Sequence, residues 1–275
     1  MFADNSKESE AAPKADVSAG RSYLLHQADH NLTNETDAPI EDRDANHDRL
    51  LERVASLSNL ARALLFVARN KGAAGVDGVS TEEVVEAAPD LLPEIRHALI
   101  SGTYMSGDIR RVWIPKPGGG ERGLGIPNVI DRLRQLEPIF EPTFHDSSHG
   151  FRRYRGAQTA IAEAKGYFNK GYGITVDIDL SKFFDRVHHQ RLLGRMSQRV
   201  EDGRVLKLVH RMLKAKVVMP DGTYVVSEDG TPQGGPLSPL LSNIVLDGLD
   251  WELTRRGLKF VRYADDCAPG KVHLR

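Results

Sequence analysis

The feature that most constrains the fold is residues 260–266, Phe-Val-Arg-Tyr-Ala-Asp-Asp, where an apolar and aromatic run leads directly into two adjacent carboxylates. Burying an unpaired carboxylate is costly, because the ion loses its hydration and gains no partner. Asp265 and Asp266 therefore lie either exposed at a turn, where aspartate is common, or bound to cations. Taken alone, the stretch favours the turn.

A second acidic stretch, residues 173–185, changes this balance. Its sequence Gly-Ile-Thr-Val-Asp-Ile-Asp-Leu-Ser-Lys-Phe-Phe-Asp predicts a strand, whose two-residue period puts Asp177 and Asp179 on one face. If Asp179 lies beside Asp265 and Asp266, divalent cations are needed to neutralise the three like charges. Mg²⁺ prefers carboxylate oxygens, and two such ions about 4 Å apart can hold the attacking and leaving oxygens of a phosphoryl transfer. This is the chemistry of a nucleic-acid polymerase.

Three motifs carry a resemblance to a known family. They are Asp-Leu-Ser-Lys-Phe-Phe-Asp at 179–185, Thr-Pro-Gln-Gly-Gly-Pro-Leu-Ser-Pro at 231–239 and Tyr-Ala-Asp-Asp at 263–266. They resemble successive motifs of reverse transcriptases, most closely the bacterial group II intron-encoded reverse transcriptase/maturases, over residues 50–266. The resemblance implies an α+β fold with the fingers and palm of a right-hand polymerase, in which helices back an antiparallel palm sheet.

The resemblance also implies RNA-directed DNA synthesis, in which a primer 3′-hydroxyl attacks the α-phosphate of a deoxynucleotide and releases pyrophosphate. It implies that Asp179, Asp265 and Asp266 position two Mg²⁺ ions, for which Mn²⁺ is a substitute. The implied partners are an RNA template, a DNA or RNA primer, deoxynucleoside triphosphates and intron RNA.

Four further positions match family residues that contact the incoming nucleotide. Lys116 and Arg122 match residues of the fingers that contact the triphosphate, and Gln233 matches a residue that contacts the nucleotide. Phe184 matches the ring beneath the sugar, where a bulky side chain clashes with a 2′-hydroxyl and so selects deoxynucleotides. The alternative for a phenylalanine here is a core position, which we expect Phe183 to fill.

Residues 109–127 predict a β-hairpin with a glycine-rich tip, and strand alternation is expected to bring Arg111, Lys116 and Arg122 near that tip. These charges are either solvated or grip a triphosphate, arginine by bidentate contact and lysine as a point charge. The motif match favours the second interpretation.

Residues 148–155, Ser-His-Gly-Phe-Arg-Arg-Tyr-Arg, resemble a Gly-Phe-Arg-Pro segment of the family, with Arg-Tyr in place of the usual Pro-Gly. Arg152 and Arg155 beside Phe151 and Tyr154 suit nucleic-acid contact, because basic groups bind phosphates and rings stack on bases. A solvated loop with two anchoring rings explains the same residues equally well, so both alternatives stay open.

Composition is typical of a globular protein, and its charge is unevenly distributed. The net charge of −1 divides into −7 over residues 1–48 and +6 over the remainder. A basic body is what a phosphate-backbone partner would favour, but ordinary surface charge explains the excess as well, so it decides little by itself. No stretch approaches the roughly 20 apolar residues of a membrane span, and no signal-peptide pattern is present. The single cysteine, Cys267, excludes an internal disulfide and fits a reducing compartment. The resemblance to the bacterial family implies a cytoplasmic location.

Helices are predicted where apolar residues recur every three or four positions, at 50–67, 80–100, 156–169, 190–198, 203–215 and 237–256. Ser80 and Glu83 form a capping-box signature at the start of the second. Residues 216–226 predict a hairpin that turns at Pro-Asp-Gly. The last helix is expected to pack beneath the sheet that carries the three aspartates.

The predicted organisation has four parts. They are a disordered acidic leader (1–48), fingers with N-terminal helices and the basic hairpin (49–172), a palm with a helical insertion at 189–215 (173–266) and an aberrant tail (267–275). The family continues after Asp266 with a returning strand, which Pro269 and Gly270 disfavour here. We therefore expect a truncated or frameshifted reading frame that lacks the helical thumb.

Two other functions compete with polymerisation. An RNA-binding splicing cofactor, or a remnant of one that has lost polymerase activity, would bind intron RNA without needing Asp265. The short helix at 128–140, the altered arginine loop at 148–155 and the missing thumb favour it. A palm-type nucleotidyl cyclase shares the carboxylate chemistry, but nothing resembles the Gly-Gly-Asp-Glu-Phe turn of that family, and the loop at 231–239 argues against it.

Overall fold

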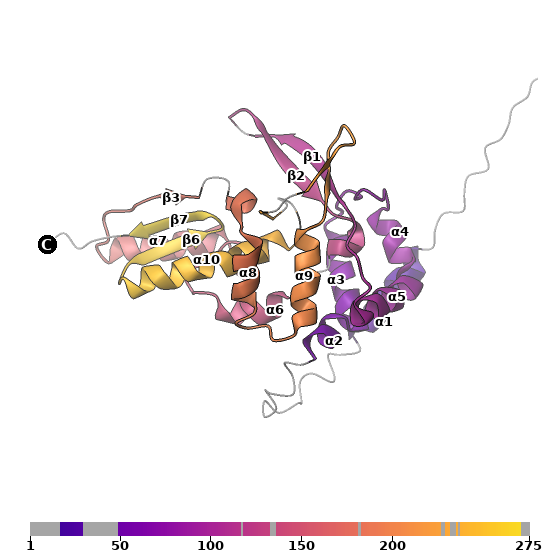
Figure 1. Cartoon of the computed structure of the whole chain (residues 1–275). Coiled ribbons are helices and arrows are strands. Elements are labelled where there is room, and N and C mark those ends of the chain that lie inside the picture. The colour runs from indigo at the N-terminus through magenta and orange to yellow at the C-terminus, as the bar shows by residue number, and fades with distance from the viewer. Residues whose placement is uncertain are drawn as a thin grey trace, which may run out of the picture.

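The computed structural model describes residues 17–29, 49–116, 118–132, 136–180, 183–226, 229–231, 235 and 237–270. Within these ranges the fold is α+β, as predicted. A helical N-terminal region, a middle group of helices with a projecting hairpin, and a three-stranded sheet with its own helices follow one another across the molecule (Figure 1). No helix in the described ranges is both long and apolar enough to cross a membrane.

The N-terminal region packs its helices around one apolar core. It contains α1 (Val17–Asp29), α2 (Leu50–Val54), α3 (Leu57–Arg69), α4 (Thr81–Glu86) and α5 (Ala88–Ser101). Gly20, Leu24 and Ala28, spaced four residues apart, form the buried face of α1 against α3, α4 and α5. The expected disorder of the leader is therefore wrong for α1, because this apolar face docks despite the acidic composition. The rest of the leader lies outside the described residues.

Serine caps set two of these helix starts. Ser56 Oγ accepts a hydrogen bond from the Asn59 N–H and begins α3, where the periodicity predicted one continuous helix over 50–67. Ser80 and Glu83 form the predicted capping box, in which each side chain accepts a hydrogen bond from the other residue's backbone N–H. Caps thus divide a region that apolar spacing alone makes continuous.

The projecting hairpin belongs to a four-stranded sheet of order β2-β1-β4-β5. Its strands are β1 (Ile109–Pro115), β2 (Glu121–Ile126), β4 (Val217–Val218) and β5 (Tyr224–Val225). β1 and β2 pair antiparallel as predicted, whereas β4 pairs with β1 in parallel. The hairpin at 216–226, which we had assigned to the palm, therefore extends the sheet of the fingers.

Short helical segments and two longer helices form the middle of the molecule. They are the 3₁₀ helices η1 (Val129–Arg132) and η2 (Glu141–Thr143), with α6 (Glu137–Phe140), α8 (His189–Met196) and α9 (Gly203–Leu213). Buried aliphatic residues of α2, α8 and α9 share one core with the first turns of α10. His188 caps α8 by accepting a hydrogen bond from the Arg191 N–H, as expected for a helix start.

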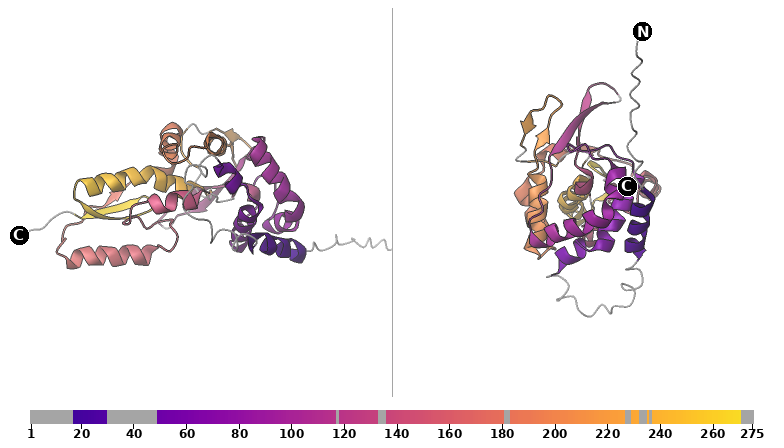
Figure 2. Two further views of the ribbon diagram at one scale, coloured as in Figure 1. Left: turned by 90° about the horizontal axis from the view of Figure 1, so that it is seen from below. Right: turned by 90° about the vertical axis from the view of Figure 1, so that its right-hand side faces the viewer.

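The palm is a three-stranded antiparallel sheet of order β3-β7-β6. Its elements are α7 (Ala157–Asn169), β3 (Ile178–Asp179), the 3₁₀ helix η3 (Phe183–Arg186), α10 (Ser238–Arg255), β6 (Lys259–Tyr263) and β7 (Asp266–Gly270). α10 lies on one face of the sheet and α7 on the other (Figure 2). Leu253 of α10 packs with Phe260 and Cys267 of the strands, as the prediction for this helix required.

β7 corrects the expectation that no strand follows Asp266. Tyr263 and Asp266 close the two-residue turn and form a hydrogen-bonded pair. Hydrogen-bonded and non-hydrogen-bonded pairs alternate along an antiparallel ladder, so Phe260↔Pro269, three pairs further on, is a non-hydrogen-bonded pair. The missing N–H of Pro269 therefore costs no bond with β6, and β3 pairs only with Asp266 and Cys267. A proline at this register position is compatible with a strand that composition alone disfavours.

Candidate active site

The turn between β6 and β7 carries the acidic pair. Tyr263 pairs with Asp266, so Ala264 and Asp265 are the two central residues of a tight hairpin turn. Ala264 has a φ of 59°, a conformation that turns of this kind usually give to glycine. Across the other edge of β7, Asp179 of β3 pairs directly with Asp266. The backbones of the three predicted metal ligands thus meet at one end of the palm sheet.

The described side chains are compatible with a divalent cation here but do not by themselves form its site. Asp265 is partly exposed, and the carboxylate of Asp179 lies outside what the structure describes. Among the described side chains, no three of His, Cys, Asp or Glu gather in a group that could hold a metal ion. The donors that the register brings together are carboxylate oxygens, which suit hard cations.

A cavity of about 530 Å³ lies beside this turn and joins three distant parts of the chain. Arg122 comes from β2, Phe184 from η3 and Asp265 from the turn. The other residues that line it are Phe66, Val67, Asn70, Gly72, Ala73, Leu124, Ile126, Pro127, Arg132, Phe151, Gly235, Ser238 and Pro239. A cation from the fingers, a ring and a carboxylate therefore face one space, in which a charged and partly planar ligand could bind.

The two adjacent phenylalanines have different surroundings, and Phe183 contacts the core as predicted. Phe183 packs against the middle core, and Phe184 lines the cavity. The segment that begins the proline-rich motif is hydrogen-bonded to Phe184, because the Thr231 N–H donates to its carbonyl at 2.7 Å. Gly230, with a φ of 89°, packs so closely on this backbone that a Cβ atom would lie 2.9 Å from the Phe184 carbonyl oxygen. Gln233 lies outside the described residues.

Of the three basic residues predicted near the tip of the hairpin, only Lys116 and Arg122 lie there. Lys116 follows β1 at the tip and Arg122 pairs with Ile114 nearby, and both side chains are exposed. Arg111 pairs with Gly125 at the base of the hairpin and donates a hydrogen bond to the Gly123 carbonyl at 3.0 Å. The expectation that Arg111 lies near the tip is wrong, because the register puts it four residues down β1.

The arginine loop is mostly used within the protein. Arg152 is only 9% exposed and donates to the Glu141 carboxylate at 2.9 Å and to three backbone carbonyls, so it stabilises the loop itself. Arg155 forms an ion pair of 2.8 Å with Asp146. Phe151 lines the cavity and Tyr154 is 93% exposed, each with positive φ. The rings, more than the two arginines, are therefore available to a ligand.

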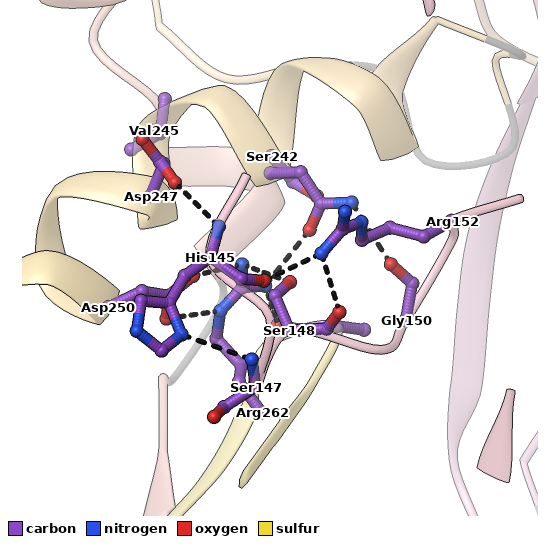
Figure 3. A network of polar contacts seen from close by, with 12 residues as sticks. His145, Ser147, Ser148, Gly150, Arg152, Ser242, Val245, Asp247, Asp250 and Arg262 are labelled. Atoms are coloured by element: carbon purple, nitrogen blue, oxygen red, sulfur yellow. Dashed lines mark hydrogen bonds and ion pairs between the residues drawn. The ribbon is translucent and has the colours of Figure 1, made fainter. Parts of the chain in front are cut away.

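Sequence reasoning missed the buried Arg262, which lies in a network of polar contacts with Ser148 and Asp250 (Figure 3) and also contacts the acidic turn. Arg262 and Asp250 are both 0% exposed and form a bidentate ion pair of 2.7 and 2.8 Å. The same guanidinium donates to Asn243 Oδ1, to Ser148 Oγ and to the Ala264 carbonyl. The available signal was Asn243 and Asp250, which lie two helical turns apart in an apolar stretch of α10.

The segment before the arginine loop is fixed to α7 through Glu163. The Ser147 and Tyr167 hydroxyls each donate to Glu163 at 2.7 Å, and His149 Nε2 lies 2.7 Å from the same carboxylate. Burial opposes ionisation of Glu163, but these hydrogen bonds outweigh it and hold its pKa below the ordinary value. The carboxylate therefore stabilises the fold as its anion.

A basic residue in the cavity wall connects the glycine-rich loop at 71–78 to the fingers. Arg132 is 9% exposed, donates to the Pro127 carbonyl at 2.8 Å and also to the Ala73 carbonyl. Gly72 lies against it, since a Cβ atom there would meet the guanidinium at 2.6 Å. Arg132 thus holds the loop through the Ala73 carbonyl, as a connector between helices would be held.

Comparison with known proteins identifies the family. Residues 114–269 match the family of reverse transcriptases (RNA-dependent DNA polymerases). The chain is 37% identical over 223 residues to Protein YkfC of Escherichia coli (strain K12), covering 76% of this chain and 58% of the relative. It is 36% identical over 200 residues to the group II intron-encoded protein LtrA of Lactococcus lactis subsp. cremoris, covering 70% and 33%.

A solved structure of a partial Cas6-RT-Cas1–Cas2 complex is also similar, with a TM-score of 0.49 and 20% identity over 81% of this chain and 38% of that chain. This chain therefore spans 58% of the length of YkfC and 33% of the length of LtrA. The matched relatives confirm the resemblance to the group II intron type. The chain belongs to the reverse transcriptase family, the RNA-dependent DNA polymerases.

Proposed function

We propose that this chain carries the polymerase site of a group II intron-type reverse transcriptase and extends a primer 3′-hydroxyl with deoxynucleotides on an RNA template. The observation that carries the proposal is the cavity that joins Arg122, Phe184 and Asp265. Each has the chemistry that one part of a deoxynucleoside triphosphate requires: a cation for phosphates, a ring for the sugar and a carboxylate for metal-bound oxygens.

Reverse transcriptases generally use divalent metal ions. We assign these to Asp179, Asp265 and Asp266, with two Mg²⁺ ions as the natural occupants and Mn²⁺ as a substitute. When bound, the ions lower the pKa of the primer hydroxyl and neutralise charge on the phosphates. In the reaction the primer 3′-hydroxyl gives up its proton to water and its oxygen bonds to the α-phosphorus. The bond between the α-phosphorus and the α,β-bridging oxygen breaks, and pyrophosphate leaves.

The other assignments concern binding. Arg122 and Lys116 hold the triphosphate from the exposed hairpin, and Phe184 excludes a 2′-hydroxyl from beneath the sugar. Gln233 contacts the nucleotide from the proline-rich loop. The nucleic-acid partners are an RNA template, a DNA or RNA primer and intron RNA, with the exposed ring of Tyr154 offered for base stacking.

The test is deoxynucleotide incorporation on an RNA template with an annealed DNA primer and Mg²⁺, comparing the unchanged chain with Asp265→Ala. We expect the unchanged chain to extend the primer and Asp265→Ala to fall to background, because the turn then lacks a metal-binding carboxylate. Glu94→Ala, on the exposed face of α5, is the matched control and should extend like the unchanged chain. A folded chain that binds intron RNA but adds no nucleotide would overturn the proposal in favour of a splicing cofactor.

A further inference from the structure

The Ala264–Asp265 turn is held in place by one buried side chain. Resting on the polymerase function proposed above, we infer that Arg262 is a positioning residue for the metal-binding turn. It acts from the buried side of the sheet, through the backbone of Ala264, and touches neither substrate nor the proposed metal ions. Its task is to hold Asp265 in one orientation.

The orientation of Asp265 depends on a hydrogen bond from Arg262 to the peptide unit between Ala264 and Asp265. Arg262 Nη1 donates to the Ala264 carbonyl oxygen at 2.8 Å. That carbonyl belongs to the peptide unit that links Ala264 to Asp265, and a peptide unit is planar. Its orientation therefore sets the direction in which the Asp265 side chain leaves the backbone.

The guanidinium cannot shift without losing other bonds. All five of its N–H donors are used, the remaining four by Asp250, Asn243 and Ser148 at 2.7 to 2.9 Å. A lysine has three donors at one point and cannot reproduce this planar pattern. The side chain is thus fixed in position before it contacts the turn.

The turn needs such a contact because its backbone is strained. Ala264 has a φ of 59°, which is unfavourable for a residue with a Cβ atom and persists only where surroundings enforce it. Gly150 packs directly against the backbone of the turn, since a Cβ atom there would lie 2.1 Å from the Ala264 nitrogen. Asn243 holds Gly150 by donating to its carbonyl at 3.0 Å, while also accepting from Arg262.

Stability alone is a weak explanation for this ion pair. Replacing a buried pair with well-packed apolar residues is often neutral or stabilising, whereas the pair specifies a geometry that apolar residues cannot. Asp250 neutralises Arg262, and Asn243 and Ser148 complete its bonds. The arrangement therefore resembles the outer residues that orient metal ligands in other proteins.

The experiment separates positioning from folding by using two variants and a matched control. Arg262→Lys keeps the charge but loses the planar set of donors, and the double variant Arg262→Met/Asp250→Leu replaces the pair with apolar side chains. The control is Asp202→Asn, which weakens another largely buried carboxylate, paired with Arg204 at 2.8 Å and bonded to the Leu51 N–H, between α9 and α2. Thermal melting verifies that each variant is folded.

The first readout is Mn²⁺ affinity of the protein without nucleic acid, measured by electron paramagnetic resonance. The second is kcat and KM for the deoxynucleotide. We expect Arg262→Lys and the double variant to weaken Mn²⁺ binding and kcat by about 10-fold to 100-fold, the range for outer residues of metal sites, with the nucleotide KM unchanged. Asp202→Asn should change neither quantity.

Each outcome either supports the positioning role of Arg262 or overturns it. If the folded double variant binds Mn²⁺ and turns over like the unchanged chain, the pair is only structural and the inference is wrong, while the polymerase proposal stands. If the unchanged chain binds Mn²⁺ and the variants lose that affinity, but none extends a primer, the polymerase proposal fails and the positioning role of Arg262 is retained. An unfolded Arg262→Lys leaves the decision to the double variant.

Discussion

The palm turn and the fingers hairpin each place a charged side chain, Asp265 and Arg122, in the wall of the same cavity, but the turn is fixed by buried contacts and the hairpin is exposed. The turn is held by Arg262, which is fully buried and bonded through every donor. The hairpin carries Lys116 and Arg122 as exposed side chains. Its three tip glycines all have positive φ, and a Cβ atom added at any of them would meet nothing within 4 Å.

The difference corresponds to what each region is proposed to do. Metal ligands and reacting atoms must be held to within fractions of an ångström, because small misplacements are costly in rate. Side chains that bind a triphosphate must extend into the solvent to contact it. They can become ordered on binding, which costs side-chain entropy. A clamped turn and an open hairpin therefore suit one catalytic and one binding role.

Displacing the clamped turn should have the largest effect. In Gly150→Ala the new Cβ atom would lie 2.1 Å from the Ala264 nitrogen, so the turn has to move. Gly150 is not among the glycines with positive φ, which leaves this clash as the main change. We expect primer extension to fall by about 100-fold, the cost typical of an ångström-scale misplacement. Steady-state incorporation on a primed RNA template measures it.

The control for this prediction is Gly166→Ala on α7. A Cβ atom there meets nothing within 4 Å, and alanine favours a helix over glycine by roughly 0.5–1 kcal/mol. This variant should extend primers normally and melt at a slightly higher temperature. Full activity of Gly150→Ala would show that the turn tolerates displacement, and the contrast with the hairpin would disappear.

Changing the open hairpin should affect binding and leave stability intact. Arg122→Ala removes an exposed guanidinium, and surface changes of this kind usually alter the unfolding free energy by less than about 0.5 kcal/mol. We expect the deoxynucleotide KM to rise roughly tenfold, since a hydrogen bond to a charged group contributes about 1.5–3 kcal/mol. Nucleotide titrations and thermal melting together measure both quantities.

Arg122→Lys sharpens the same prediction. Lysine keeps a point charge but loses bidentate contact, so its KM should lie between those of the unchanged chain and Arg122→Ala. A large loss of stability in either variant would contradict the view that this hairpin is built for reach.

Local signals predicted much of the fold and of the site. The acidic pair at a turn, the capping box at Ser80 and the hairpin at 109–127 depend on neighbouring residues, and the structure contains all three. The division between Phe183 and Phe184 follows from adjacent positions that face opposite environments. In the turn, the capping box and the hairpin, the determining contacts lie close together in the sequence.

Long-range pairing was the main source of error. The β4 strand joins β1 across more than a hundred residues, and α1 docks through a short buried face formed by Gly20, Leu24 and Ala28. β7 forms because its register places Pro269 where no bond to β6 is needed. Arg262 is buried because Asp250 meets it from α10. Such partners are brought together only by tertiary packing, which a single sequence does not display.

The smallest of the three expected effects is a loss of stability in acid, and it should begin in the region around the palm turn. Glu163 fixes Ser147 and His149 next to the clamp, and its pKa in the folded protein lies below the unfolded value. A lowered folded pKa means that the anion stabilises the fold at pH values above the unfolded pKa. This contribution is lost as the pH falls through the folded pKa.

Glu163→Gln tests this sign. The variant should be less stable than the unchanged chain near neutral pH by about 1 kcal/mol, the net contribution of a typical hydrogen bond. Below the ordinary glutamate pKa of 4.5 the two stability curves should converge as the pH falls through the folded pKa, because the unchanged chain then loses the same anion. Denaturant unfolding at a series of pH values measures the curves, and Glu94→Gln on exposed α5 is the matched control. Parallel curves would mean that Glu163 contributes only a hydrogen bond, and the clamp would then be no more sensitive to acid than the hairpin.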